Sequence, residues 1–286
     1  MSWRGSAHGK CILIGEHAVV HGTTAIAMPV GLQVNVELDE GEPLAGLPDA
    51  FTTWFRNLAT ERTGRALVPV SADGDLPQGA GLGSSAALSV AALRALDAAG
   101  GKVDHELIAL ADEAERIFHG NPSGIDVRTV CADGPITYRR TAAGPDIAPL
   151  PRCAAPLWFE LWMTPPGLPT AEVVARVSAS LDRSGRDGAL ADAEATVQAA
   201  RTALLAGDVA GLGSAMTHFH RWLAQHGAST DLLDELVQLA LDHGAPGAKL
   251  TGGGGGGTMI VLLPDATWTA PQLPADVARA RFVLET

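Results

Sequence analysis

The chain is poor in cysteine and in long hydrophobic runs. Its three cysteines, Cys11, Cys131 and Cys153, have neither metal-ligand spacing nor an even count, so a reducing cytoplasm is the expected location. No stretch offers about eighteen strongly apolar residues, and the first ten residues lack the apolar core of a secretory signal. Neither a membrane span nor a secretory leader is therefore expected.

Positive charge is also scarce. The chain has 32 acidic and 20 basic residues, a net charge of −12 and a pI of about 5.1, which disfavours nucleic acid and anionic membranes as partners. Only three residues are lysines, Lys10, Lys102 and Lys249, and two of them flank glycine-bearing segments. Lysine is a compact charge that suits a phosphate or carboxylate, although chance in an arginine-biased sequence also explains the pattern.

The hydrophobic patterns predict an α+β protein. A chain of 286 residues with 47% hydrophobic content can build one large domain or two ordinary ones. Alternating or apolar runs predict strands at 11–15, 31–39, 65–72, 135–140, 157–163 and 258–263. Helical patterns cover 49–64, 86–99, 104–118, 171–182, 189–206, 208–225 and 231–243. Because strands come early in each half, we expect two domains, 1–155 and 156–286.

A glycine-rich loop precedes the alanine-rich helix at 86–99. Gly79, Gly81 and Gly83 lead into Ser84 and Ser85, without the lysine of a Walker A loop and without the strand that a dinucleotide site requires. Backbone N–H groups at such a helix start can cradle phosphates, and the Ser85 hydroxyl can ligate Mg²⁺. A plain serine cap is the alternative.

Glu115 lies on the predicted apolar stripe of the 104–118 helix, with Ile108, Ala111 and Phe118. Burying a carboxylate there is costly unless a cation pairs with it. The neighbouring residue types offer oxygen ligands, which favours Mg²⁺ over a transition metal. The alternative is a rotated helix with Glu115 in solvent.

Two further segments carry reactive side chains. In HGNPSGID, residues 119–126, a tight turn holds Asp126, which is either a general base or a turn cap. In GKCILIGEHAVVHG, residues 9–22, a strand separates Lys10 from Glu16 and His17. The i, i+4 spacing of His17 and His21 suits metal ligands, but local hydrogen bonds explain such histidines more often.

Six consecutive glycines, Gly252–Gly257, stand between Lys249-Leu250-Thr251 and the predicted strand at 258–263. A flexible linker in solvent would need neither the Lys-Leu-Thr sequence before it nor a buried strand directly after it. We therefore expect a close-packed turn in which a Cβ atom would collide with its neighbours.

Four segments, taken in chain order, resemble the motifs of the GHMP kinases, and most closely those of the mevalonate kinases. They are residues 9–22, 77–89, 119–126 and 249–259. The resemblance implies a two-domain fold with ATP and a small alcohol between the domains, phosphorylation of the C5 hydroxyl of mevalonate, and a homodimer as one option. It implies that Asp126 is the catalytic base, that Lys10 orients the hydroxyl, and that Ser85 and Glu115 hold Mg²⁺. It places Glu16, His17 and Asp126 on the substrate side. The residues it implies around the ATP phosphates are Gly79, Ala80, Gly81, Leu82, Gly83, Ser84 and Ser85.

The chain departs from the family pattern near the substrate side. His8 replaces a proline, Val127-Arg128 replaces a small pair, and Thr170 lacks the basic residue that precedes it in many relatives. A sister kinase that uses phosphomevalonate or another small alcohol is the main alternative, and Arg128 is the candidate extra positive charge for a phosphorylated substrate. A ligand-binding member without activity is disfavoured because Lys10, Ser85, Glu115 and Asp126 are all present. A dinucleotide-dependent oxidoreductase is disfavoured by the missing strand before the glycine loop.

Overall fold

A computed structural model describes residues 2–120 and 122–285 and confirms the α+β class. The chain forms two compact units. Unit 1 comprises Met1–Lys10, Pro29–Gln78 and Leu82–Asp133, and unit 2 comprises Cys11–Met28, Gly79–Gly81 and Gly134–Thr286. Both unit boundaries near the N-terminus fall inside strands, because β1 (Trp3–Ile14) and β2 (Thr24–Asp39) each continue from one unit into the other.

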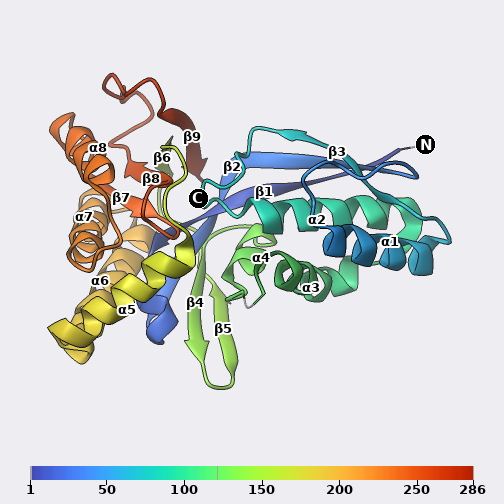
Figure 1. The fold of residues 1–286 in the computed structure, drawn as a ribbon. Coiled ribbons are helices and arrows are strands. Elements are labelled where there is room, and N and C mark those ends of the chain that lie inside the picture. Colours follow the sequence, from blue (N-terminus) through green and yellow to red (C-terminus); the bar gives the residue numbers. More distant parts are fainter. Residues whose placement is uncertain (1, 121, 286) are drawn as a thin grey trace. The chain divides into compact units, whose positions relative to one another are not determined.

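In unit 1, helices pack against one side of the strands (Figure 1). The second half of β2 pairs antiparallel with β3 (Val68–Gly74). The helices are α1 (Asp49–Thr63), α2 (Ser84–Leu96), α3 (Leu107–His119) and α4 (Ile125–Val130), with short helical turns at Asp97–Gly101 and Asp104–Glu106.

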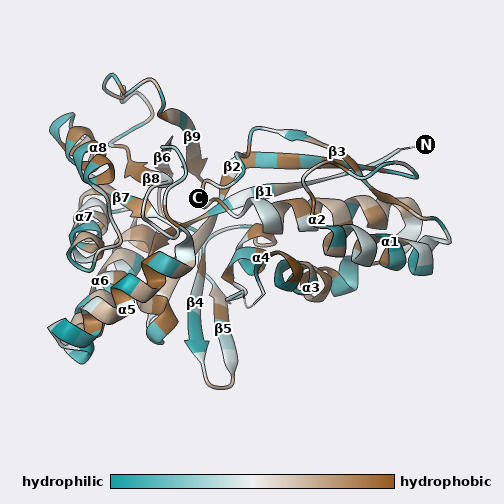
Figure 2. Ribbon diagram, viewed as in Figure 1, coloured by the Kyte–Doolittle hydropathy of each residue, from teal (hydrophilic) through white to brown (hydrophobic). Residues whose placement is uncertain are grey.

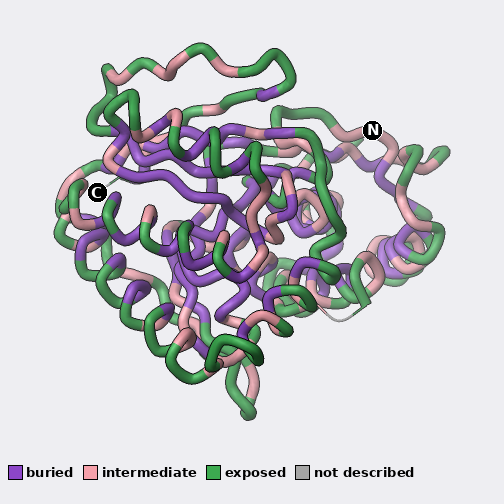
Figure 3. Tube along the Cα trace, turned by 60° about the vertical axis from the view of Figure 1, so that its left-hand side comes forward, coloured by how far each residue is buried: buried purple, intermediate pink, exposed green. Residues whose placement is uncertain are grey.

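Helix α2 is the centre of the core of unit 1. Ten of its residues, from Ala86 to Leu96, are buried, and Phe51 and Phe55 of α1 belong to the same cluster. Alanine makes this possible because its small side chain lets neighbouring helices approach from several sides while it keeps a high helix propensity. Figure 2 shows hydrophobic residues in brown on α1, α2 and α3, and Figure 3 shows the buried stretches of the chain in purple. Helix α2 is thus anchored in the core along almost its whole length.

Unit 2 contains a four-stranded antiparallel sheet in the order β7-β8-β6-β9. The strands are β6 (Leu157–Met163), β7 (Gly247–Thr251), β8 (Thr258–Leu262) and β9 (Ala278–Leu284). The helices are α5 (Thr170–Ser184), α6 (Arg186–Ala206), α7 (Val209–Gln225) and α8 (Asp231–Asp242), of which α7 and α8 contact β7. A hairpin of β4 (Ile136–Thr141) and β5 (Gly144–Pro149) pairs with the first part of β2, and a short helical turn covers Ala18–His21.

The predicted elements exist, but their patterns were misjudged in places. Ile108 is 43% exposed, so the buried stripe of α3 runs through Leu110, Ala111, Ala114 and Glu115 instead. Strands β5 and β7 and helix α4 were not predicted, since they are short and lie at Gly- and Pro-rich positions. Strand β9 was not predicted either, because it begins with the weakly apolar sequence Ala-Arg-Ala-Arg. Among the described residues, no helix is long and apolar enough to cross a membrane.

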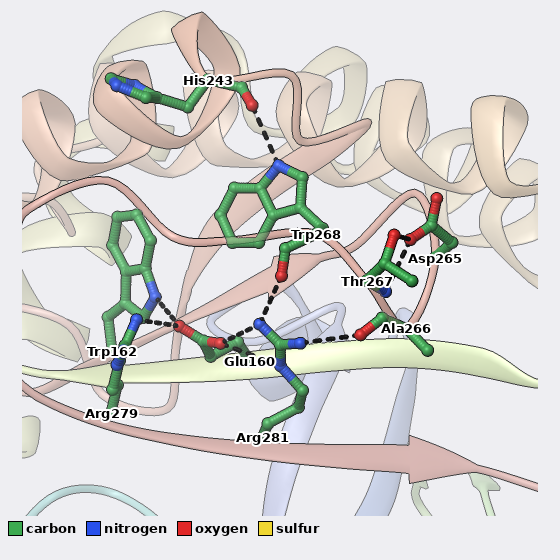
Figure 4. A network of polar contacts seen from close by, with 9 residues as sticks. All are labelled: Glu160, Trp162, His243, Asp265, Ala266, Thr267, Trp268, Arg279 and Arg281. Atoms are coloured by element: carbon green, nitrogen blue, oxygen red, sulfur yellow. Dashed lines mark hydrogen bonds and ion pairs between the residues drawn. The ribbon is translucent and has the colours of Figure 1, made fainter.

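The sequence of β6 suggests one buried and one exposed face, but in the structure both faces are largely covered. Trp162 is fully buried and Glu160 is only 3% exposed. The chain between β8 and β9 lies over this side of the sheet, and its Trp268 carbonyl accepts a hydrogen bond from Arg281 (Figure 4). The Glu160 carboxylate accepts hydrogen bonds from Trp162 Nε1 at 2.9 Å and from Arg281 Nε and Nη2 at 3.1 and 2.8 Å.

We expect Arg281→Met to destabilise unit 2 strongly. The substitution removes the guanidinium that donates two hydrogen bonds to Oε2 of the buried Glu160 carboxylate, which costs about 3–5 kcal/mol of unfolding free energy. Arg279→Met is the matched control, because Arg279 is 54% exposed and its Nη1 lies 3.8 Å from Glu160. Urea unfolding measures both variants, and equal losses would contradict this role of Arg281.

Candidate active site

The three glycines of the 79–85 loop are required by its backbone. Gly79, Gly81 and Gly83 have φ angles of +72°, +78° and +72°, a left-handed region that other residues rarely adopt. The loop crosses the unit boundary, since Gly79–Gly81 belong to unit 2 and the rest to unit 1. Ser84 and Ser85 then begin α2, and no side chain caps this helix start. Its first backbone N–H groups are therefore available to an anion.

Lys10 lies directly over Gly83. A Cβ atom at Gly83 would come within 2.8 Å of Lys10 Cγ and 3.0 Å of its Cε, so no larger residue fits there unless Lys10 moves. The Lys10 backbone N–H also donates to Leu82 O at 2.9 Å, which fixes β1 to the loop. The scarce lysine that the sequence singles out is thus placed by the loop itself.

The ammonium group of Lys10 pairs with Asp126. Lys10 Nζ lies 2.9 Å from Asp126 Oδ1, and the two side chains are 5% and 32% exposed. Asp126 lies in the first turn of α4, after a turn that contains Gly120 and Gly124, both with positive φ. Asn121 of this motif lies outside the described residues. The turn delivers a partly accessible carboxylate next to a buried cation.

Glu115 is buried in α3, as its position on an apolar stripe predicts. Only 2% of the residue is exposed, and Oε1 has no hydrogen-bond partner among the described residues. Burial raises the pKa of Glu115; the nearby Asp126 carboxylate raises it further, and the Ser85 hydroxyl opposes both by hydrogen bonding to the carboxylate. A buried carboxylate with an unpaired oxygen, beside a hydroxyl, provides hard donors that suit a divalent cation.

His119 joins this pair and was not expected there. Its Nε2 lies 2.9 Å from Ser85 Oγ and 3.8 Å from Glu115 Oε2. The i, i+4 spacing from Glu115 to His119 is visible in the sequence, but His119 falls just after the predicted helix of residues 104–118, in the segment assigned to a turn. Within the described residues, no group of three His, Cys, Asp or Glu side chains is arranged to hold a metal ion.

Arg128 forms an ion pair with Asp112, which lies one turn before Glu115 on α3. The side chains of Arg128 and Asp112 are 22% and 17% exposed. The guanidinium also lies over Gly124, where a Cβ atom would come within 3.3 Å of its Nη1. The positive charge of Arg128 is therefore matched by a local carboxylate. His8, the other departure in this unit, is exposed on β1.

In unit 2, the glycine run is close-packed backbone. A Cβ atom at Gly252 would lie 3.2 Å from Gly81 O, and one at Gly254 would lie 2.3 Å from Ala228 O. The Gly255 N–H donates to Ala228 O at 2.8 Å, and Gly255 O accepts from the Leu168 N–H at 3.0 Å. Contacts of this kind exclude a freely moving linker.

A cavity of about 280 Å³ opens beside this run in unit 2. Thr170, the first residue of α5, lies on its wall, and a Cβ atom at Gly253 would come within 2.4 Å of its Oγ1. The cavity lining comprises Gly79, Ala80, Gly81, Pro166, Gly167, Leu168, Pro169, Thr170, Thr251, Gly253, Gly254, Gly256, Gly257 and Thr258. Backbone from the 79–85 loop and from the glycine run thus lines one cavity.

Glu16 and His17 follow β1 in unit 2. Glu16 forms a buried ion pair with Lys249, whose side chain is fully buried, and burial lowers the pKa of Lys249 while Glu16 opposes that shift. His17 has a positive φ of 62° and its Nε2 lies 3.0 Å from Gly253 O. Burial lowers the pKa of His17 to about 4, so the ring is neutral at neutral pH and Nε2–H donates to Gly253 O.

The contacts of His21 bear on the alternative that His17 and His21 bind a metal together. His21 lies 2.8 Å from Arg186 Nη1 through Nδ1 and 3.3 Å from Ser178 Oγ through Nε2. His17 and His21 thus make separate local hydrogen bonds and do not share a metal site. The Nδ1 atom of His17 has no hydrogen-bond partner among the described residues, and as an acceptor it suits a hydroxyl donor.

Comparison with known proteins gives consistent matches along the chain. The models of the GHMP kinases N terminal domain and the GHMP kinases C terminal match residues 52–134 and 200–267. A mevalonate kinase from Aeropyrum pernix is 32% identical over 91% of this chain and 88% of its own length. The structure of L. major mevalonate kinase in complex with R-mevalonate superimposes with a TM-score of 0.82 at 26% identity, over 99% of this chain and 95% of that one.

The fold by itself is less selective. The Streptococcus pneumoniae phosphomevalonate kinase aligns with a TM-score of 0.72 at 19% identity, over 93% of this chain and 92% of that one. At that identity only the fold is shared. Two proteins with different names thus have similar folds, and the substrate has to be argued from the site.

We expect Gly254→Val to impair folding or nucleotide use severely. Its φ of +69° and the 2.3 Å approach to Ala228 O leave no room for a branched side chain. Gly188→Val is the control, because Gly188 is exposed on α6 with nothing within 4 Å of the added Cβ atom. Thermal unfolding and ATP binding measure both variants, and a Gly254→Val protein with unchanged values would restore the linker interpretation.

Proposed function

The chain belongs to the mevalonate kinase family of the GHMP kinases, and we propose that it transfers the γ-phosphoryl group of ATP to the C5 hydroxyl of mevalonate. The product is 5-phosphomevalonate, in isoprenoid precursor synthesis by the mevalonate pathway. The observation that carries the proposal is the Lys10–Asp126 ion pair, held next to the start of α2 by Gly83. This pair supplies a base and a cation where a phosphoryl acceptor needs both.

Asp126 and Lys10 have different proposed roles toward the acceptor hydroxyl. In the proposed step, the C5 oxygen forms a bond to the γ-phosphorus while the bond from that phosphorus to the ADP oxygen breaks. The proton of the hydroxyl passes to the Asp126 carboxylate, which is partly accessible. Lys10 orients the hydroxyl and stabilises negative charge on its oxygen. Positioning and electrostatics of this kind supply most of the catalysis in phosphoryl transfer.

The phosphates of ATP are assigned to the 79–85 loop and the N-terminus of α2. Uncapped backbone N–H groups and the helix dipole both favour an anion there. We assign Mg²⁺ to Ser85 and Glu115, because the unpaired Oε1 of Glu115 and the Ser85 hydroxyl fit a hard cation. When bound, the ion neutralises charge on the phosphate oxygens.

The substrate is assigned to residues that follow β1 as well as to Asp126. Neutral His17 offers its buried Nδ1 as an acceptor for a substrate hydroxyl. Glu16 acts through the buried Lys249 pair, which holds this end of β1 against β7. Thr170 lines the glycine-walled cavity with its hydroxyl.

The pairing of Arg128 argues against a phosphorylated substrate. Phosphomevalonate would need positive charge beyond that required for an alcohol. Lys10 and Arg128, the cations described near Asp126, already face Asp126 and Asp112. With Glu115 close by, carboxylates outnumber these cations, which favours an acceptor without its own phosphate.

Several broader features stay predictions. They are a division into domains at residues 1–155 and 156–286, a site between these domains, a cytoplasmic location and a homodimer. A small-molecule substrate, rather than nucleic acid or a membrane, agrees with the net charge of −12.

A substrate panel tests the proposal directly. Purified protein with ATP and Mg²⁺ should convert mevalonate to its 5-phosphate with one ADP per product, measured by ³¹P NMR and a coupled ADP assay. Phosphomevalonate and other small alcohols serve as competitors. Brisk turnover of one of these with none of mevalonate would overturn the substrate assignment.

Asp126→Asn should lower the transfer rate by at least about 100-fold, because the amide cannot accept the hydroxyl proton. ATP affinity should stay nearly unchanged, as measured by calorimetry. Asp133→Asn, at an exposed position of the same unit, is the control and should retain wild-type rates. Turnover by Asp126→Asn at the wild-type rate would remove Asp126 from the role of base.

A further inference from the structure

His119 lies where a third ligand of a cation at Ser85 and Glu115 would lie. Its Nε2 is 2.9 Å from Ser85 Oγ and 3.8 Å from Glu115 Oε2. Adjacent ligands of an octahedral cation with bonds of about 2.1 Å are separated by about 3 Å. The imidazole nitrogen and the hydroxyl oxygen therefore already stand at the distance of neighbouring ligands, and a small movement of the exposed His119 ring would bring its nitrogen equally close to the carboxylate.

The three side chains come from helix termini that the fold fixes. Ser85 is in the first turn of α2, and Glu115 and His119 are on successive turns of the last part of α3. Glu115 is 2% exposed with an unpaired Oε1, which points to a cation independently of His119. The His119 side chain is 54% exposed, so it can adjust its ring toward a cation without disturbing the core.

We propose that His119 is a direct ligand of the divalent cation, through Nε2, together with Ser85 and Glu115. The proposal rests on the proposed function in one respect, the assignment of the cation to Ser85 and Glu115. An imidazole ligand shifts the preference of a site away from Mg²⁺ and toward Mn²⁺ and Co²⁺, since Mg²⁺ favours oxygen ligands. The sequence-based argument for Mg²⁺ assumed oxygen neighbours only, and His119 changes that donor set.

Pulsed electron paramagnetic resonance of Mn²⁺ bound with ADP tests the ligand directly. Protein labelled with ¹⁵N only at histidine should show a ¹⁵N modulation from a coordinated imidazole, distinct from the ¹⁴N of adenine. His119→Gln should lose this modulation. His105→Gln is the control, since His105 lies 69% exposed just before α3, and should retain it. A labelled wild-type protein that binds Mn²⁺ without ¹⁵N modulation would overturn the proposal, and this readout needs no substituted protein.

Metal affinity gives a second, separate measurement. In calorimetric titrations of the protein–ADP complex, His119→Gln should weaken Co²⁺ binding by at least about tenfold and Mg²⁺ binding by less. Equal losses for both ions, with an unchanged melting temperature, would mean that His119 only hydrogen bonds to Ser85. Because neither measurement uses mevalonate, failure of the ligand assignment and failure of the kinase assignment give different results.

Discussion

The absence of a side chain at Gly83 is the constraint on which the rest of the site depends. It allows the aliphatic part of the Lys10 side chain to lie against the loop backbone, in space that a Cβ atom at Gly83 would otherwise occupy. From there the ammonium group reaches Asp126 at 2.9 Å while remaining almost completely buried. Gly83 is also the residue before α2, where its left-handed φ starts the helix without a side-chain cap. One glycine therefore positions both the Lys10 ammonium group and the N-terminus of α2.

Buried charges recur in this molecule, and most of them are paired across long stretches of sequence. Lys249 pairs with Glu16, and Glu160 pairs with Arg281. Removing one partner of such a pair costs more than the pair contributes, so each pair specifies which segments lie together. Glu115 is different, because one of its oxygens has no described partner and burial raises its pKa. A carboxylate in that state is typical of a site that a ligand completes.

Much of the fold and part of the site could be predicted from local patterns. Helices α1, α2 and α5 to α8 follow their periodicity, and Glu115 was detected because a carboxylate on an apolar stripe conflicts with the cost of burial. The partner of Lys249 was out of reach because 233 residues separate it from Glu16 and no local rule joins them. Strands such as β7 and β9 depend on pairing with their neighbours in the sheet rather than on their own sequence. His119 was missed because it lies one residue beyond the predicted helix of 104–118, whereas α3 includes it.

The scarcity of lysine has a practical consequence for protein chemistry. Lys10 is 4% exposed and Lys249 is fully buried, whereas Lys102 lies exposed on the turn after α2 with a φ of 52°. Within the described residues, Lys102 is therefore the accessible lysine. Of the three lysines, amine-reactive dyes or surface-coupling reagents would therefore modify Lys102 in the folded protein and leave Lys10 and Lys249 unmodified. Labelling of Lys10 or Lys249 would in turn report that the buried ion pairs had opened.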